Sequence, residues 1–175
     1  MKNEIFDHKL IKAKKYSKKL ENKSFKVFIK SIEDLEFLFL KNKKHFFWQN
    51  LKKNKISLYL FYLEMEIIGC LSIITHKGIN HIYGIYVSKK YRSQKIGNFI
   101  LKYLYTHFKN KLKTSHINKN LKTKEKILNF FLKNGWSIYN KKKNIKQINQ
   151  WIDKNNRYKK NYYDEKILLV YNLNK

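Results

Sequence analysis

The sequence predicts an α/β (α+β) fold in which helices flank a mixed central sheet of about six to seven strands. Two runs rich in β-branched and aromatic residues, 56–63 and 67–74, are separated by a short polar break and are typical of an antiparallel hairpin. Farther along, apolar residues recur at helical spacing, at positions 96, 99, 100, 103, 104 and 108. Strand and helix patterns alternate elsewhere, which favours a sheet covered by helices.

The elements before the hairpin are predicted from shorter patterns. Residues 1–24 are lysine-rich and are expected to form a basic N-terminal arm, followed by a single domain over 25–175. Alternating residues at 25–29 predict a first strand. Ser31 can cap a helix that carries Leu35, Leu38 and Phe39. A second helical piece, 45–51, carries the aromatic residues Phe46, Phe47 and Trp48, for which burial in the core is the commoner use.

The elements after the hairpin follow in regular order. Gly84 inside the third β run can form a bulge or allow close approach of another molecule. The remaining predictions are a strand over 81–87, the long helix from 96, a strand over 112–117, a helix capped by Thr123 and ended by Gly135, a strand over 136–139, a short helix over 145–152 and a last strand over 166–173.

The formal net charge of +28 first suggests a nucleic-acid-binding protein. However, only Arg92 and Arg157 among the 40 basic residues are arginine, and the chain has no proline. Abundant Lys, Asn, Ile, Tyr and Phe, which have AT-rich codons, indicate a genomic skew. Specific recognition of phosphates or bases usually exploits arginine. Weak, salt-sensitive, non-specific association with RNA is therefore expected rather than specific binding.

The remaining composition excludes several classes of protein. Cys70 is the single cysteine, so neither a disulfide framework nor a thiolate metal site can form within the chain. His76 and His81 lack carboxylate or thiolate partners for a metal, so no metal cofactor is expected. No apolar run approaches the roughly 18 residues of a membrane span, and no secretory signal is recognisable. We expect a cytoplasmic protein that does not bind membranes, with the oligomeric state open between monomer and homodimer.

The loop after the third β run carries the main motif. Val87 is followed by Tyr91, Arg92, Ser93, Gln94, Lys95, Ile96 and Gly97. A strand, a short loop and a helix start together present backbone amides to a phosphate. The loop resembles the R/Q-x-x-G-x-G/A motif of the GNAT acetyltransferase superfamily. A second signature of that family, N-x-x-A-x-x-F-Y-x-x-x-G-F, falls in register on Lys124, Ile127, Phe130, Phe131, Gly135 and Trp136.

The resemblance covers about residues 25–140 and extends to the last strand. It implies the GNAT-type acyl-CoA fold, with acetyl-CoA as the acyl donor. By resemblance, the coenzyme A pyrophosphate would be bound at Arg92, Ser93, Gln94, Lys95, Ile96, Gly97 and Asn98, and the pantetheine arm would pair with Ile85, Tyr86 and Val87. Phe131 belongs to the same implied cofactor-binding set. Lys95 departs from the family, which prefers glycine there; it restricts the backbone and adds a cation.

At the positions of the acid and base, the sequence departs from the family pattern. Phe131 stands where the family commonly has a tyrosine that protonates the leaving thiolate. Candidates to replace that tyrosine as the proton donor are Tyr103, Tyr105 and Tyr139. A role in packing or at the surface would also explain each of them. No Asp or Glu occurs between Ile67 and Lys124, and the nearby Glu64 and Glu66 are expected to be solvated.

His81 and His116 are the candidate catalytic residues because they lie on the two strands predicted to bracket the site, and histidine titrates near neutrality. Ordinary strand histidines would give the same pattern.

Two functional hypotheses remain. The first is an acetyl-CoA-dependent N-acetyltransferase that acts on a primary amine of an unidentified small molecule or protein. The alternative is a catalytically weakened basic interaction module of the same fold that associates with RNA or ribosomes. This alternative is favoured by Phe131, Lys95 and Lys124, which depart from the family pattern. Candidate acceptor-site residues are Phe46, Phe47, Trp48 and Trp151.

Overall fold

The computed structural model describes residues 10–76, 78–108, 112–118, 122–139 and 166–171 of the 175-residue chain. These residues form a mixed sheet of seven strands with four α-helices, which confirms the predicted fold class. The strands pair in the order β1-β2-β3-β4-β5-β7-β6. The elements are β1 (Ile11–Lys15), α1 (Lys23–Ser31), η3 (Leu35–Leu40), α2 (Phe46–Lys52), β2 (Ile56–Leu63), β3 (Glu66–His76), β4 (Ile79–Val87), η4 (Lys89–Tyr91), α3 (Ile96–His107), β5 (Leu112–Asn118), α4 (Lys124–Lys133), β6 (Ser137–Ile138) and β7 (Lys166–Tyr171).

The chain divides into two compact units. The first comprises Met1–Ile74 and Gly84–Thr106, and the second comprises Thr75–Tyr83 and His107–Lys175. Strands β3 and β4 pass through both units. The predicted organisation into an arm and a single domain stays a prediction.

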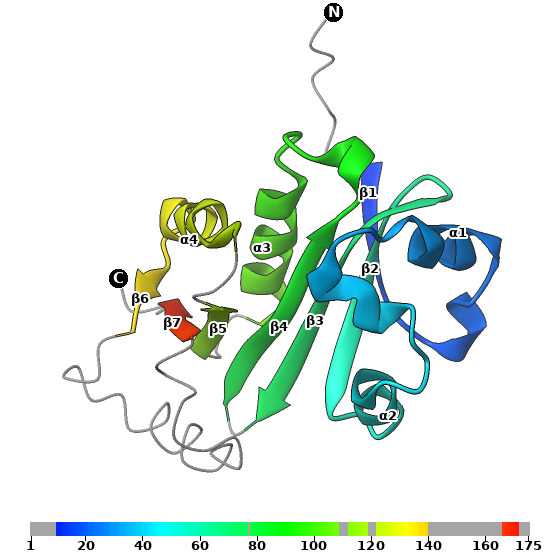
Figure 1. The fold of residues 1–175 in the computed structure, drawn as a ribbon, viewed down its shortest axis with the longest axis horizontal. Coiled ribbons are helices and arrows are strands. Elements are labelled where there is room, and N and C mark those ends of the chain that lie inside the picture. Colours follow the sequence, from blue (N-terminus) through cyan, green and yellow to red (C-terminus); the bar gives the residue numbers. More distant parts are fainter. Residues whose placement is uncertain (1–9, 77, 109–111, 119–121, 140–165, 172–175) are drawn as a thin grey trace, which may run out of the picture. The chain divides into compact units, whose positions relative to one another are not determined.

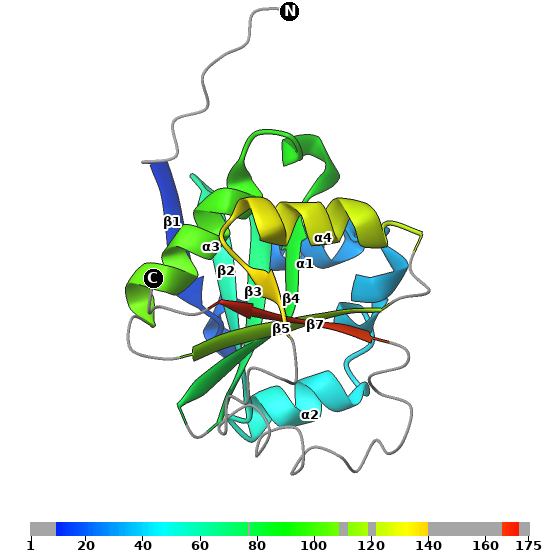
Figure 2. The ribbon, with the colours of Figure 1, turned by 90° about the vertical axis from the view of Figure 1, so that its left-hand side faces the viewer.

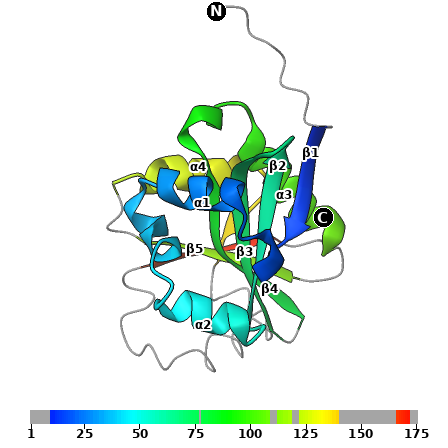
Figure 3. The ribbon, with the colours of Figure 1, turned by 90° about the vertical axis from the view of Figure 1, so that its right-hand side faces the viewer.

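In the first unit, β1, β2 and β3 pair antiparallel, so the hairpin predicted at 56–74 is confirmed. Helix α3 covers one face of these strands, while α1 and η3 lie on the other face (Figure 1, Figure 3). Phe61 of β2 packs edge-on against Phe99 and Tyr103 of α3. On the opposite face Phe28 of α1 packs against Tyr86 of β4. Aromatic side chains therefore pack on both faces of this part of the sheet.

The segment predicted as a strand at 25–29 is helical, so that prediction was wrong. Helix α1 begins after Asn22, whose side chain accepts a hydrogen bond from the Phe25 amide at 3.1 Å. Phe25 and Phe28 are both buried, and residues three apart share one face of a helix but lie on opposite faces of a strand. Ser31 is the last residue of α1 rather than a cap of the next helix, and its hydroxyl donates to the Phe28 carbonyl.

Part of the expected N-terminal arm belongs to the sheet. Residues 11–15 form β1, in register with β2 from Ile11 opposite Leu63 to Lys15 opposite Tyr59. Only Ile11 of this strand is buried. The lysines that follow it mask the strand pattern in the sequence, and pairing with the apolar β2 decides the conformation.

In the second unit, β4 pairs parallel with β5, and β7 lies antiparallel between β5 and β6 (Figure 2). Helix α4 ends as predicted at Gly135, which has a φ of 82°. The Gly135 and Trp136 amides donate to the carbonyls of Leu132 and Phe131, the hydrogen-bond pattern of a Schellman motif. The predicted cap, Thr123, precedes α4 but makes no side-chain capping bond.

Two predictions, the helix over 145–152 and the placement of Trp151, lie outside the described residues. Among the described helices, none has the length and apolar character needed to cross a membrane.

Candidate functional site

The end of β4 is shaped by glycines on two neighbouring strands. A Cβ on Gly69 of β3 would lie 2.6 Å from the Tyr86 carbonyl oxygen, so only glycine fits there without a backbone shift. A Cβ on Gly84 would lie 2.8 Å from the ring of Phe37, which packs on Tyr86. Gly84 thus makes room for an aromatic side chain of η3. Of the predicted pantetheine-pairing residues, Tyr86 is buried, whereas Ile85 and Val87 are half-buried.

The loop between β4 and α3 adopts an unusual backbone conformation. Ser93 and Lys95 have φ values of 66° and 59°, in the left-handed region that non-glycine residues rarely occupy. Turns of this kind can direct successive backbone amides toward one concave side, as in anion-binding nests. Helix α3 then begins at Ile96, so the Ile96 and Gly97 amides belong to its first turn. Amides in a first helical turn have no intrahelical acceptor and carry the positive end of the helix dipole.

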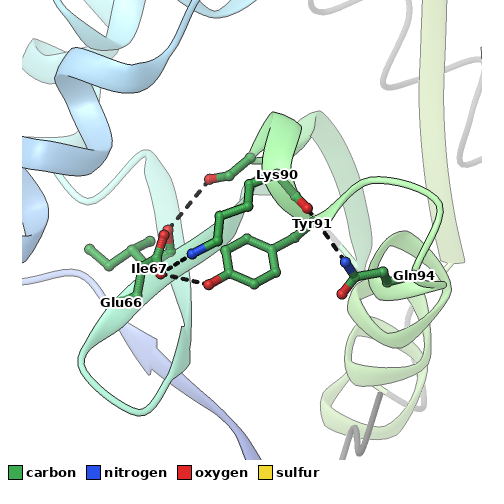
Figure 4. A network of polar contacts seen from close by, with 6 residues as sticks. Glu66, Ile67, Lys90, Tyr91 and Gln94 are labelled. Carbon is green, nitrogen blue, oxygen red and sulfur yellow. Dashed lines mark hydrogen bonds and ion pairs between the residues drawn. The ribbon is translucent and has the colours of Figure 1, made fainter. Parts of the chain in front are cut away.

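Glu66, the first residue of β3, holds the start of this loop. Its carboxylate accepts a hydrogen bond from the Tyr91 hydroxyl at 2.6 Å. The same carboxylate forms an ion pair with Lys90 at 3.2 Å. Figure 4 shows both side chains pointing toward Glu66. In the same view Gln94 donates back to the Lys90 carbonyl at 3.4 Å. Burial, followed by the hydrogen bond to Glu66, raises the pKa of Tyr91, so the hydroxyl stays a donor. The expectation that Glu66 is merely solvated misses this contact.

The Arg92 side chain turns toward carboxyl and carbonyl groups of the first unit. It forms an ion pair with Asp34, which precedes η3, and its Nε donates to the Val87 carbonyl at 3.0 Å. Its guanidinium also lies 5.7 Å from the centroid of the Tyr86 ring. Lys89 pairs with Glu33 at 3.6 Å. Among the described ion pairs, none involves Lys95, which is exposed.

The structure brings the two candidate histidines together. His81 Nε2 lies 2.9 Å from His116 Nδ1, and the planes of the two rings are nearly parallel, at an angle of 10°. His81 Nδ1 lies 2.9 Å from the Thr114 hydroxyl. Thr114 is the residue of β5 that lies opposite His81 in the parallel β4–β5 pair. His81 and Thr114 are buried, and His116 is half-buried. Sequence reasoning found both histidines but not Thr114, because parallel pairing is not visible in local patterns.

Phe131 of α4 is buried in the second unit. Its ring packs edge-on against Trp136 at 5.0 Å and against Phe130 at 5.4 Å. These contacts explain an apolar residue at this position, and its assignment to cofactor binding stays a prediction.

The alternative proton donors also have packing roles. Tyr103 lies against Tyr59 and Phe61, and burial raises its pKa. Burial likewise raises the pKa of Tyr139. Tyr105 is half-buried. Tyr103 and Tyr139 are therefore protonated near neutrality, and no described contact distinguishes one of the three tyrosines as the acid.

The predicted acceptor-site aromatics divide between core and surface. Phe47 and Trp48 are buried, as the commoner use of such residues predicts, whereas 46% of Phe46 is exposed. Within the described residues, no group of three or more His, Cys, Asp or Glu side chains could hold a metal ion.

Comparison with known proteins supports one family. The family model described as an acetyltransferase (GNAT) domain matches residues 54–138, which include β4, the loop, α3 and α4. A search of curated proteins finds no significant match.

Solved structures of low sequence identity share the fold. A GNAT family acetyltransferase from Elizabethkingia anophelis with acetyl-CoA bound is 18% identical, with a TM-score of 0.60 over 93% of this chain and 98% of that one. The N-acetyltransferase PseH from Campylobacter jejuni is 16% identical, with a TM-score of 0.59 over 92% and 96%. The PaiA N-acetyltransferase from Thermoplasma acidophilum in complex with coenzyme A is 13% identical, with a TM-score of 0.57 over 92% and 98%. These comparisons lend no support to a basic interaction module.

Proposed function

We propose that this chain, whose residues 54–138 match the GNAT acetyltransferase domain, transfers an acetyl group from acetyl-CoA to a primary amine of a small molecule or protein. The observation that carries the proposal is the backbone of the loop from Arg92 to Asn98. Two left-handed residues, Ser93 and Lys95, lead directly into the first turn of α3.

The loop fits an anionic group such as the coenzyme A pyrophosphate. Amides of a loop that leads into a helix start can bind an anion, and the Glu66–Tyr91 hydrogen bond fixes the start of this loop. Lys95 adds an exposed cation without a carboxylate partner among the described ion pairs. We propose that Arg92, Ser93, Gln94, Lys95, Ile96, Gly97 and Asn98 bind the phosphates, and that Ile85, Tyr86 and Val87 pair with the pantetheine arm.

Acyl transfer to an amine requires removal of a proton from the ammonium form. We assign this step to His116, with His81 as a positioning residue. When Thr114 Oγ1 accepts the His81 Nδ1 proton, His81 Nε2 must accept a hydrogen bond from His116 Nδ1. That tautomer leaves the lone pair of His116 on Nε2, where it can take the proton of the amine. Acetyl-CoA supplies an activated thioester, whose thiolate leaves readily even though Phe131 cannot protonate it.

The first test is direct binding and transfer. We expect acetyl-CoA to raise the melting temperature of the purified protein and an amine panel to show transfer of labelled acetyl groups. Gly97→Glu should abolish the heat stabilisation, because a carboxylate in the first turn of α3 repels phosphate. Gly78→Ala, at the turn before β4, is the control for a glycine substitution as such. Stabilisation that survives Gly97→Glu contradicts the proposed phosphate site.

A further inference from the structure

An ammonium group sits among three aromatic rings in the first unit. Lys43, between η3 and α2, places its Nζ 3.7 Å from the centroid of the Trp48 ring, 5.2 Å from that of Phe25 and 5.9 Å from that of Tyr16. The carboxylate of Glu21 accepts a hydrogen bond from the same Nζ at 2.6 Å. We call Tyr16, Glu21, Phe25 and Trp48 the ammonium box.

The walls of the ammonium box are held by contacts among themselves. The Tyr16 ring lies 5.5 Å from Phe25 and 5.6 Å from Trp48, and the latter two pack edge-on at 6.3 Å. Phe25 and Trp48 are buried, and the Tyr16 hydroxyl donates to Glu21. These contacts do not require Lys43, so the box is preorganised for a cation.

The charge of the box suits an ammonium ligand. Hydrogen bonds from Lys43 and then from Tyr16 lower the pKa of Glu21, so its carboxylate is ionised near neutrality. Burial and the contact with Glu21 raise the pKa of Tyr16, which keeps its hydroxyl a donor. Aromatic faces with a carboxylate beside them recognise alkylammonium groups in proteins generally.

We propose that the ammonium box binds one ammonium group of a diamine acceptor, and that Lys43 occupies the box until the ligand displaces it. The assignment of the ligand as an acceptor rests on the proposed acetyltransferase function. Lys43 can leave because it lies on a loop and 49% of its side chain is exposed. The Lys43 ammonium competes with the ligand for the ammonium box. A cation that makes no contacts outside the box therefore binds weakly.

Helix α1 connects the box with the end of β4. Phe25 is a wall of the box, and Phe28, one helical turn later, packs on Tyr86 at 5.7 Å. Three helical residues rise about 4.5 Å. One face of a single helix therefore serves both the ammonium box and the strand proposed to pair with pantetheine, which suits an acceptor that has its two amines on a short chain.

The test measures binding without turnover. Protein labelled with 5-fluorotryptophan gives fluorine signals for Trp48, Trp136 and Trp151, and Trp48→Phe assigns the first. We expect 1,4-diaminobutane to shift the Trp48 signal at constant ionic strength. Lys43→Ala should lower the dissociation constant at least tenfold, while Lys44→Ala, at the adjacent exposed lysine, should leave it unchanged. Glu21→Gln should weaken binding.

A shift of the Trp48 signal would indicate a specific site, because a protein with a net charge of +28 repels cations in general. Lys43→Gln serves as a second variant that removes the charge but keeps most of the side chain. An unmoved Trp48 signal in folded Lys43→Ala or Lys43→Gln protein overturns the box as a binding site.

Steady-state kinetics then tests the assignment of the ligand as acceptor. Lys43→Ala should lower KM for 1,4-diaminobutane about tenfold and leave KM for n-butylamine, which has no second ammonium, unchanged. Equal KM values for 1,4-diaminobutane in wild-type and variant protein overturn this assignment. If 1,4-diaminobutane binds but no amine in the panel is acetylated, the acetyltransferase proposal fails while the ammonium box stands.

Discussion

Arg92 and Asp34 form an ion pair that joins the loop before α3 to the segment between α1 and η3. The same guanidinium donates to the Val87 carbonyl. Asp34 therefore competes with any phosphate for Arg92. About two-fifths of each side chain is exposed, so the pair contributes on the order of 0.2–1 kcal/mol.

Removing the competing carboxylate should strengthen cofactor binding. We expect Asp34→Asn to lower the dissociation constant of acetyl-CoA about threefold at low salt, with a smaller effect at high salt because the interaction is screened. Glu33→Gln is the matched control, since Glu33 pairs loosely with Lys89 and is largely exposed. Isothermal titration calorimetry measures both. An equal gain in the two variants would indicate a general charge effect instead.

Lys95 should carry backbone strain that glycine relieves. A non-glycine residue in the left-handed region costs roughly 1–2 kcal/mol, and Lys95 has a φ of 59°. We expect Lys95→Gly to raise the free energy of unfolding by about 1 kcal/mol and the melting temperature by roughly 2–4 °C. Lys95→Ala removes the same charge without relieving the strain and should show no gain. Urea denaturation distinguishes the two outcomes.

The Tyr91 hydroxyl should stabilise the loop through Glu66. Tyr91→Phe removes a hydrogen bond to a charged acceptor and should cost about 1.5 kcal/mol of unfolding free energy. Lys90→Met removes only an exposed ion pair to the same carboxylate and should cost less than about 0.5 kcal/mol. Acetyl-CoA binding should weaken more in Tyr91→Phe than in Lys90→Met. A reversed order would show that the ion pair, rather than the hydroxyl, holds the loop.

Lys113 should make stability depend on pH above neutrality. This residue is fully buried, its Nζ donates to the Phe108 carbonyl at 2.7 Å, and burial lowers its pKa from 10.5 to about 8. The unfolded chain keeps the proton up to a higher pH than the folded protein. Stability should therefore rise as pH increases from 7 to 9.5, by about 2 kcal/mol from this group.

The matched variant for this pH dependence is Lys113→Met. It should show no such rise, because methionine does not titrate. Urea titrations between pH 7 and 9.5 avoid the range above 10, where tyrosines with raised pKa values oppose the trend. A wild-type curve parallel to that of Lys113→Met contradicts the prediction.

The histidine pair should control the pH dependence of catalysis. His116→Gln should lower kcat by roughly 100-fold or more, the usual effect of losing a general base. Thr114→Val removes the hydroxyl that orients His81. It should give a smaller loss and shift the acid limb of the pH–rate profile, whereas a merely structural role would change stability alone. Partial rescue of His116→Gln by added imidazole would support the base assignment.

Local patterns predicted much of the fold, and they failed where composition and spacing point to different structures. The apolar, β-branched and aromatic residues of 25–29 suggest a strand, whereas the spacing of Phe25 and Phe28 and the capping bond from Asn22 favour a helix. The sequence of residues 11–15 gives only a weak strand pattern, and these residues form a strand because they pair with β2. By contrast, the end of α4 at Gly135 was predictable because a left-handed residue there strongly favours glycine.

By itself, the sequence determined the strand, loop and helix around residues 85–98 and their register with the second motif at 124–136, because both depend on spacing along the chain. Only the tertiary structure decided which side chains hold that loop. Glu66 and Asp34 reach it from distant elements, and Thr114 meets His81 through parallel strand pairing. Such contacts depend on how separate segments pair and pack, and no local pattern records them.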